Sequence, residues 1–164
     1  MQDKIEFDFG PDVEIELDLE AEADMVIDPI ITKTIEALSA WYNKGKVEKE
    51  EARALLLELR RLIGKTDLHL RMSTKRGCFI IRQYKEYLER DIEALDNFLA
   101  LNSPEMHGDL FKSVSDFREY LVEFHVFMNG ASSGCGEELD SRIASIRKYV
   151  EETTAKIDDL LAEQ

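Results

Sequence analysis

Cys135 is the residue of this chain whose surroundings come closest to those of a reactive thiol. It lies in the glycine-rich segment 130–136, directly before a predicted helix. The free amides and the dipole at a helix start favour a thiolate. Glu137 and Glu138 follow at once and oppose that charge. An enzyme with Cys135 as its reactive thiol is therefore one alternative interpretation.

The histidines do not form a recognisable metal site. They fall in three different predicted elements and lack the paired spacing of zinc-binding helices; they are His69, His107 and His125. No loop has the glycine and terminal glutamate of an EF-hand calcium site. We therefore predict no metal, no cofactor and no catalytic residue, and the favoured interpretation is a protein that is not an enzyme.

The first 24 residues indicate a different chemistry, the recognition of charge, because acidic and apolar residues alternate along them. Side chains of a strand point to opposite faces at a period of two, so the pattern predicts strands with one acidic and one apolar face. Gly10-Pro11-Asp12 interrupts the alternation and is a turn signal, which allows a β-hairpin. The carboxylates that we assign to partner binding are Glu14, Glu16, Asp18, Glu20, Glu22 and Asp24.

Charge is distributed unevenly along the chain. Residues 1–28 hold eleven acidic residues and one lysine, a net charge of −10, whereas residues 29–164 hold 24 acidic and 20 basic residues, a net charge of −4. A strongly acidic segment attracts basic protein surfaces, and it repels nucleic acid and anionic membranes. We therefore predict a basic protein partner, no direct binding of nucleic acid and no binding to membranes.

Other interpretations of the acidic strands stay open. The charges can prevent edge-to-edge aggregation while the apolar face packs on the rest of the protein. The carboxylates can bind Ca²⁺ or another hard cation. The strands can pair between protomers, so a self-associating homo-oligomeric subunit is the main alternative function. Mimicry of nucleic acid is the narrowest form of the favoured interpretation, although a row of carboxylates about 6.6 Å apart is sparser than the ~1.7 Å charge spacing of duplex DNA.

A basic segment lies in the middle of the chain. From Leu68 to Lys85 there are five basic residues and no acidic one. Such a segment is either a docking site for the acidic strands of the same molecule or a contact for phosphate or nucleic acid. The residues of this predicted basic patch are Arg71, Lys75, Arg76 and Arg82.

The elements that must position these residues are mostly helices, because apolar residues recur at intervals of three and four. Asp28-Pro29 and Ser103-Pro104 are typical helix starts. The glycines predicted to end helices are Gly45, Gly64 and Gly130. The predicted helices are 29–44, 47–63, 78–101, 103–130 and a last one that follows Gly136 and runs to Leu160, with a loop or short strand at 65–77. The short link between the first two predicts an antiparallel helix pair.

These elements predict a mainly α fold, a four- to five-helix bundle at residues 29–164 with an acidic β-strand or β-hairpin arm at residues 1–28. A chain of 164 residues with 44% hydrophobic residues can bury a substantial core in one domain. The two cysteines, Cys78 and Cys135, lie in unlike surroundings and do not indicate a disulfide. The first residues lack the features of a secretory signal. We therefore expect unpaired thiols and a cytoplasmic protein.

Trp41 is the aromatic residue that we add to the predicted partner-binding set. It adjoins Tyr42 at the end of the first predicted helix. Neighbouring residues of a helix cannot face the same way, so one of the two should be more exposed than its size suggests, and such residues often anchor interfaces. The function that the sequence favours is that of a non-enzymatic protein–protein interaction protein, an inhibitor, mimic or chaperone of a basic partner.

Overall fold

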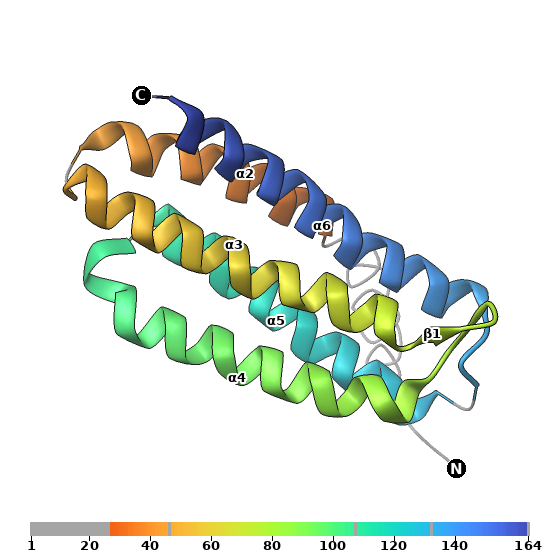
Figure 1. Cartoon of the computed structure of the whole chain (residues 1–164). Helices are drawn as coiled ribbons and strands as arrows, with labels where there is room; N and C mark the ends of the chain where they lie inside the picture. Colours follow the sequence, from red (N-terminus) through yellow and green to blue (C-terminus); the bar gives the residue numbers. More distant parts are fainter. Residues whose placement is uncertain (1–26, 46, 107, 132, 164) are drawn as a thin grey trace, which may run out of the picture.

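The described part of the chain is a bundle of five helices with a small hairpin at one end (Figure 1). A computed structural model describes residues 27–163 except 46, 107 and 132. The helices are α2 (Ile27–Lys44), α3 (Lys49–Met72), α4 (Ile81–Met106), α5 (Asp109–Gly130) and α6 (Glu137–Ala162), and the strands are β1 (Thr74–Lys75) and β2 (Cys78–Phe79). The predicted helical bundle is confirmed, whereas the predicted acidic arm lies outside the described residues, apart from its last two.

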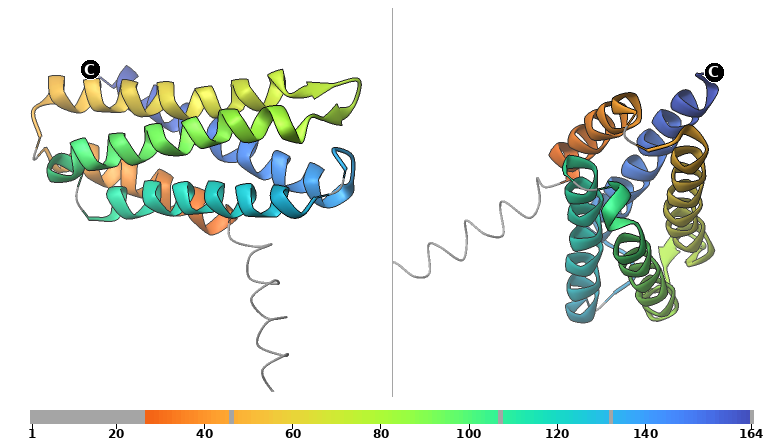
Figure 2. Two further views of the ribbon diagram at one scale, coloured as in Figure 1. Left: turned by 90° about the horizontal axis from the view of Figure 1, so that it is seen from below. Right: turned by 90° about the vertical axis from the view of Figure 1, so that its left-hand side faces the viewer.

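The five helices pack as a closed ring. Helix α2 packs on α5 and α6, α5 packs on α4, α4 packs on α3, and α3 packs on α6. In the right-hand view of Figure 2, α6 accordingly lies between α2 and α3. The first two helices run in opposite directions, as predicted (Figure 1), but they are not packing neighbours, because α6 lies between them and buries its own apolar stripe against both.

Aromatic side chains fill the interior of this ring. Tyr84, Phe117, Phe124 and Tyr149 come from three different helices and are 0% exposed. Phe117 and Tyr149 stack across the interior with ring centroids 3.7 Å apart, and the Tyr149 hydroxyl lies 3.3 Å from Oγ1 of Thr34 on α2. Burial of one such aromatic side chain stabilises a fold by roughly 1.5–3 kcal/mol, so these rings hold α2, α5 and α6 together.

Several predicted helix boundaries are wrong. The predicted helix 78–101 begins only at Ile81, because Cys78 and Phe79 form β2. Gly64 does not end the second helix, because α3 continues to Met72 and buries Thr66 and Leu70 beyond the glycine. This burial offsets the cost of a mid-helix glycine, about 1 kcal/mol relative to alanine. Pro104 does not begin a helix, because it lies in the last turn of α4, which continues to the fully buried Met106.

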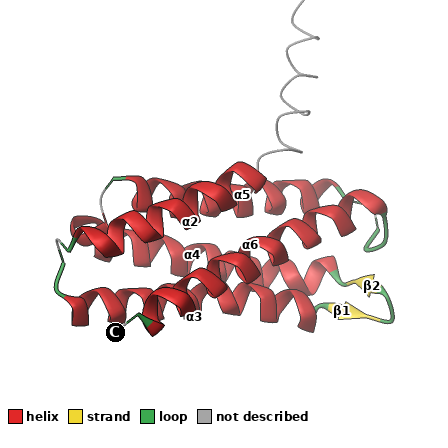
Figure 3. Ribbon diagram, turned by 90° about the horizontal axis from the view of Figure 1, so that it is seen from above, coloured by secondary structure: helices red, strands yellow, loops and turns green. Residues whose placement is uncertain are grey.

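The segment predicted as a loop or short strand at 65–77 holds the end of α3 and most of a hairpin that projects from one end of the bundle (Figure 3). In this hairpin Thr74 pairs with Phe79, and Lys75 pairs with Cys78. Its two turn residues, Arg76 and Gly77, both have positive φ, 55° and 80°, as a type I′ turn requires. The buried Phe79 anchors the hairpin to the core.

Candidate functional site

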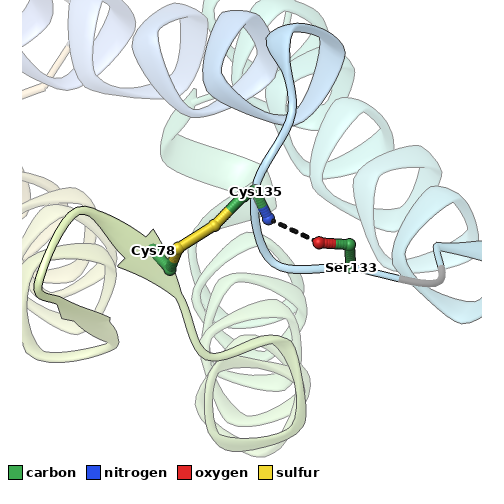
Figure 4. The surroundings of a disulfide bond; sticks show 3 residues. All are labelled: Cys78, Ser133 and Cys135. Carbon is green, nitrogen blue, oxygen red and sulfur yellow. Dashed lines mark hydrogen bonds between the residues drawn. A yellow bond between two sulfur atoms is a disulfide. The ribbon is translucent and has the colours of Figure 1, made fainter.

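A disulfide joins the hairpin to the glycine-rich loop before α6 (Figure 4). Cys78 and Cys135 are separated by 57 positions in the sequence, yet their Cα atoms lie 5.2 Å apart. The expectation of unpaired thiols is therefore wrong, and so is the alternative that Cys135 is a free reactive thiol. Both half-cystines are exposed. Sequence reasoning missed the bond because the hairpin that carries Cys78 was not recognised, and because cysteine spacing does not reveal connectivity.

Backbone contacts reinforce this connection. The Phe79 amide donates a hydrogen bond of 2.8 Å to the Gly134 carbonyl, so the loop pairs with β2 beside the disulfide. A Cβ atom at Gly134 would overlap the Phe79 carbonyl oxygen, which explains why a glycine is needed at this position. The Cys135 amide donates to Oγ of Ser133, 3.1 Å away (Figure 4). Together these contacts fix the loop against the hairpin.

The structure divides the predicted basic patch. Arg71 faces the seam between α3 and α6, where Nε lies 3.1 Å from the Asp67 carboxylate. That carboxylate also accepts a hydrogen bond of 3.0 Å from Arg147. A groove of about 590 Å³ runs along this seam and is lined by both arginines. Arg71 is thus partly neutralised and separate from the rest of the patch.

The other three residues of the basic patch lie in the hairpin and at the start of α4. Lys75 and Arg76 are exposed on the hairpin, and Arg82, in the first turn of α4, lines a hollow of about 510 Å³ together with Lys85 and Gly134. Within residues 27–163, so far as they are described, these four cations form no ion pair with a carboxylate. The basic residues at this end of the bundle are thus Lys75, Arg76, Arg82 and Lys85.

Trp41 has a structural partner. It is partly buried, and its indole Nε1 donates a hydrogen bond of 2.8 Å to the Glu105 carbonyl at the end of α4. Tyr42 is 4% exposed and belongs to the core. Of the two neighbours, Trp41 is thus the more exposed, and it ties α2 to the end of α4. Its assignment to partner binding stays a prediction.

Sequence reasoning missed a buried polar pair between α3 and α4. Nδ1 of His69 lies 2.8 Å from the carboxylate of Asp91, which is 6% exposed, and the His69 ring stacks on Tyr87 with centroids 4.4 Å apart. Burial raises the pKa of the Asp91 carboxyl above its ordinary 3.8, although the hydrogen bond with His69 acts in the opposite direction. The sequence does contain a signal for a buried carboxyl, because Asp91 falls within the apolar stripe of its helix between Leu88 and Leu95.

The described residues contain no group of three His, Cys, Asp or Glu side chains placed to hold a metal ion. Within the same residues, each helix is too short or too polar to cross a bilayer. The predicted partner-binding carboxylates from Glu14 to Asp24 lie outside the described residues. Neither a family model nor a curated protein nor a solved structure matches the chain.

Proposed function

We propose that this protein is a non-enzymatic interaction protein whose acidic arm binds a basic surface of another protein. The observation that carries this proposal is the concentration of charge, since residues 1–28 have a net charge of −10 and the remaining 136 residues have a net charge of −4. Acidic residues placed at every second position suit the recognition of a basic surface, because they steer the approach of the partner and select against acidic competitors.

The way in which the bundle uses its own charges supports the proposal. Several carboxylates of the bundle have a basic partner on another helix. These pairs are Arg60 with Asp158, Arg118 with Asp96, and Arg147 with Asp67, with nitrogen–oxygen distances of 2.7–3.0 Å. The arm, in contrast, has one basic residue, Lys4, for the ten acidic residues that precede Asp28. In the sequence, the arm therefore has far fewer basic residues for its acidic ones than the bundle has.

The test is a pull-down with three baits. The first is the wild-type chain, and the second carries Glu14→Gln, Glu16→Gln, Asp18→Asn and Glu20→Gln in the arm. The third is a matched control with the same change in net charge on exposed bundle residues that form no described ion pair, namely Glu36→Gln, Glu86→Gln, Glu151→Gln and Asp159→Asn. The proposal expects a basic protein that wild type and control retain, that the arm variant loses, and that moderate salt releases.

Equal retention by all three baits would contradict the proposal. Loss from both variants would also contradict it, because binding would then follow total charge rather than the arm. A nucleic-acid-binding protein that is retained, and that nucleic acid displaces, would identify the arm as a mimic. If an uncharged competitor released the partner and salt did not, charge would not be the basis of recognition.

Self-association is a second candidate function, supported by an apolar feature of α3. Leu57, Leu68 and Met72 are 52%, 46% and 44% exposed, and their spacing places them on the outward face of the helix. Contact between two copies would bury these side chains. Light scattering of the wild-type chain and of Leu68→Lys, over a wide range of protein concentration, tests this function. A mass that stays that of one chain throughout would exclude it.

A further inference from the structure

We propose that the Cys78–Cys135 disulfide is a thiol–disulfide exchange site, which a dithiol opens and an oxidant of the disulfide class closes. This inference does not depend on the function of the arm. It makes the pair a reversible covalent modification site at the hairpin end of the bundle, rather than a permanent part of the core.

Accessibility is the first reason. Cys78 and Cys135 are both exposed, and exposed disulfides are the ones that thiols reduce most readily. Cys78 lies on β2 and Cys135 lies in the loop before α6, so neither sulfur is enclosed between helices (Figure 4). The residue after Cys78, Phe79, is buried and holds the hairpin in place while its neighbour reacts.

The neighbouring charges give the exchange a direction. Lys75 pairs directly with Cys78 across the hairpin, so the two side chains lie on one face, and Arg76 follows Lys75 in the turn. The start of α6 favours a thiolate at Cys135, but the acidic residues of its first turn, Glu137 and Glu138, offset this effect. Cations favour a thiolate and carboxylates oppose it, and a disulfide breaks toward the better thiolate. Cys78 is therefore the leaving thiolate, and Sγ of Cys135 is the atom attacked.

The reaction balances with one dithiol. A thiolate of the dithiol attacks Sγ of Cys135, the Cys78–Cys135 bond breaks, and Cys78 leaves with the electron pair as a thiolate near Lys75. The second thiol of the reductant then attacks the mixed disulfide and releases Cys135. The protein gains two electrons and two protons as two thiols, and the dithiol becomes a cyclic disulfide. A disulfide oxidant reverses both steps.

The consequence of opening is local. The contacts that close the ring of helices lie between the helices themselves, and the buried apolar core does not include either cysteine. After reduction, the loop still has its hydrogen bond to Phe79 but loses its covalent link. The loop forms one wall of the hollow that Arg82 and Lys85 line, so reduction increases the opening of this hollow and the exchange of the loop amides.

The test uses the full chain under native conditions. Dithiothreitol is added, exposed thiols are alkylated, and peptide masses, far-UV circular dichroism and hydrogen exchange are recorded. We expect both cysteines to be labelled, the helical signal to persist, and the amides near 133–136 to exchange faster. The double variant Cys78→Ser/Cys135→Ser should show that faster exchange without any reductant. Labelling only after denaturation, or together with loss of the helical signal, would overturn the proposal.

A second measurement tests the direction. Reduced glutathione, a monothiol, traps the mixed disulfide, and we expect its adduct on Cys135. Lys75→Gln should slow reduction by about twofold to fivefold, because one exposed charge stabilises a departing thiolate only modestly. The matched control Lys33→Gln, on the exposed face of α2, should leave the rate unchanged. An adduct mainly on Cys78, or equal rates for both variants, would overturn the assignment of the attacked sulfur.

Discussion

Gly134 has the most restrictive surroundings of the described glycines, because a Cβ atom there would overlap the backbone of Phe79. Gly134→Ala should therefore separate the loop from β2 and lower the free energy of unfolding by roughly 1–3 kcal/mol. Gly64→Ala is the matched control, since its Cβ would meet nothing within 4 Å. In the middle of a helix that change should stabilise the protein by about 0.5–1 kcal/mol. Urea unfolding of both variants checks the prediction, and equal effects would contradict it.

Asp91 is the buried carboxyl whose ionisation opposes folding. Since burial raises its pKa above 3.8, the folded state holds this proton to a higher pH than the unfolded state does. Its contribution to stability is present below the ordinary pKa and is lost as pH rises through the raised pKa. The difference in unfolding free energy between wild type and Asp91→Asn should therefore fall across that window, by about 1.4 kcal/mol for each unit between the two pKa values.

Urea unfolding of wild type and Asp91→Asn at a series of pH values from 3 upward checks this expectation. A difference that rises with pH would show that the hydrogen bond with His69 outweighs burial. The exposed Asp158 is a useful contrast, because its hydrogen bonds with Arg60 lower its pKa. The contribution of this carboxylate to stability is small and is lost as pH falls. The difference in unfolding free energy between wild type and Asp158→Asn should therefore rise with pH, opposite to the trend for Asp91→Asn.

At the scale of elements, the hairpin turn carries strain that one substitution can remove. Arg76 has a φ of 55°, a conformation that is costly for a residue with a side chain and free for glycine. Arg76→Gly should therefore stabilise the hairpin, by about 0.5–1 kcal/mol in the free energy of unfolding. Thermal unfolding with the disulfide intact measures the change. A lower melting temperature would mean that the arginine side chain makes a contact worth more than the strain.

The helices themselves were largely predictable, and the failures have physical causes. The apolar stripes of α5 and α6 repeat at three- and four-residue intervals, and the buried residues follow them closely. Gly64 and Pro104 led to wrong helix boundaries. Their local preference against a continuing helix is outweighed by the burial of Leu70 and Met106, which lie further along the same helices. The disulfide and the His69–Asp91 pair were not predicted, since each joins residues whose proximity depends on how the elements pack.

At the scale of the whole molecule, the disulfide contributes to stability without being needed for the fold. It closes a sequence separation of 57 residues, and the loss of freedom in the unfolded chain corresponds to a stabilisation of about 4 kcal/mol. A helical core of this size has an expected stability of about 5–15 kcal/mol, so the reduced protein should stay folded but be less stable.

Urea unfolding should show one cooperative transition with the disulfide intact and another, at lower urea, under reducing conditions. The variant Cys78→Ser/Cys135→Ser should match the reduced protein and be insensitive to reductant. If the double variant were as stable as the oxidised wild type, the prediction would be wrong, because an unfavourable effect of the link on the folded state would then offset its restriction of the unfolded chain.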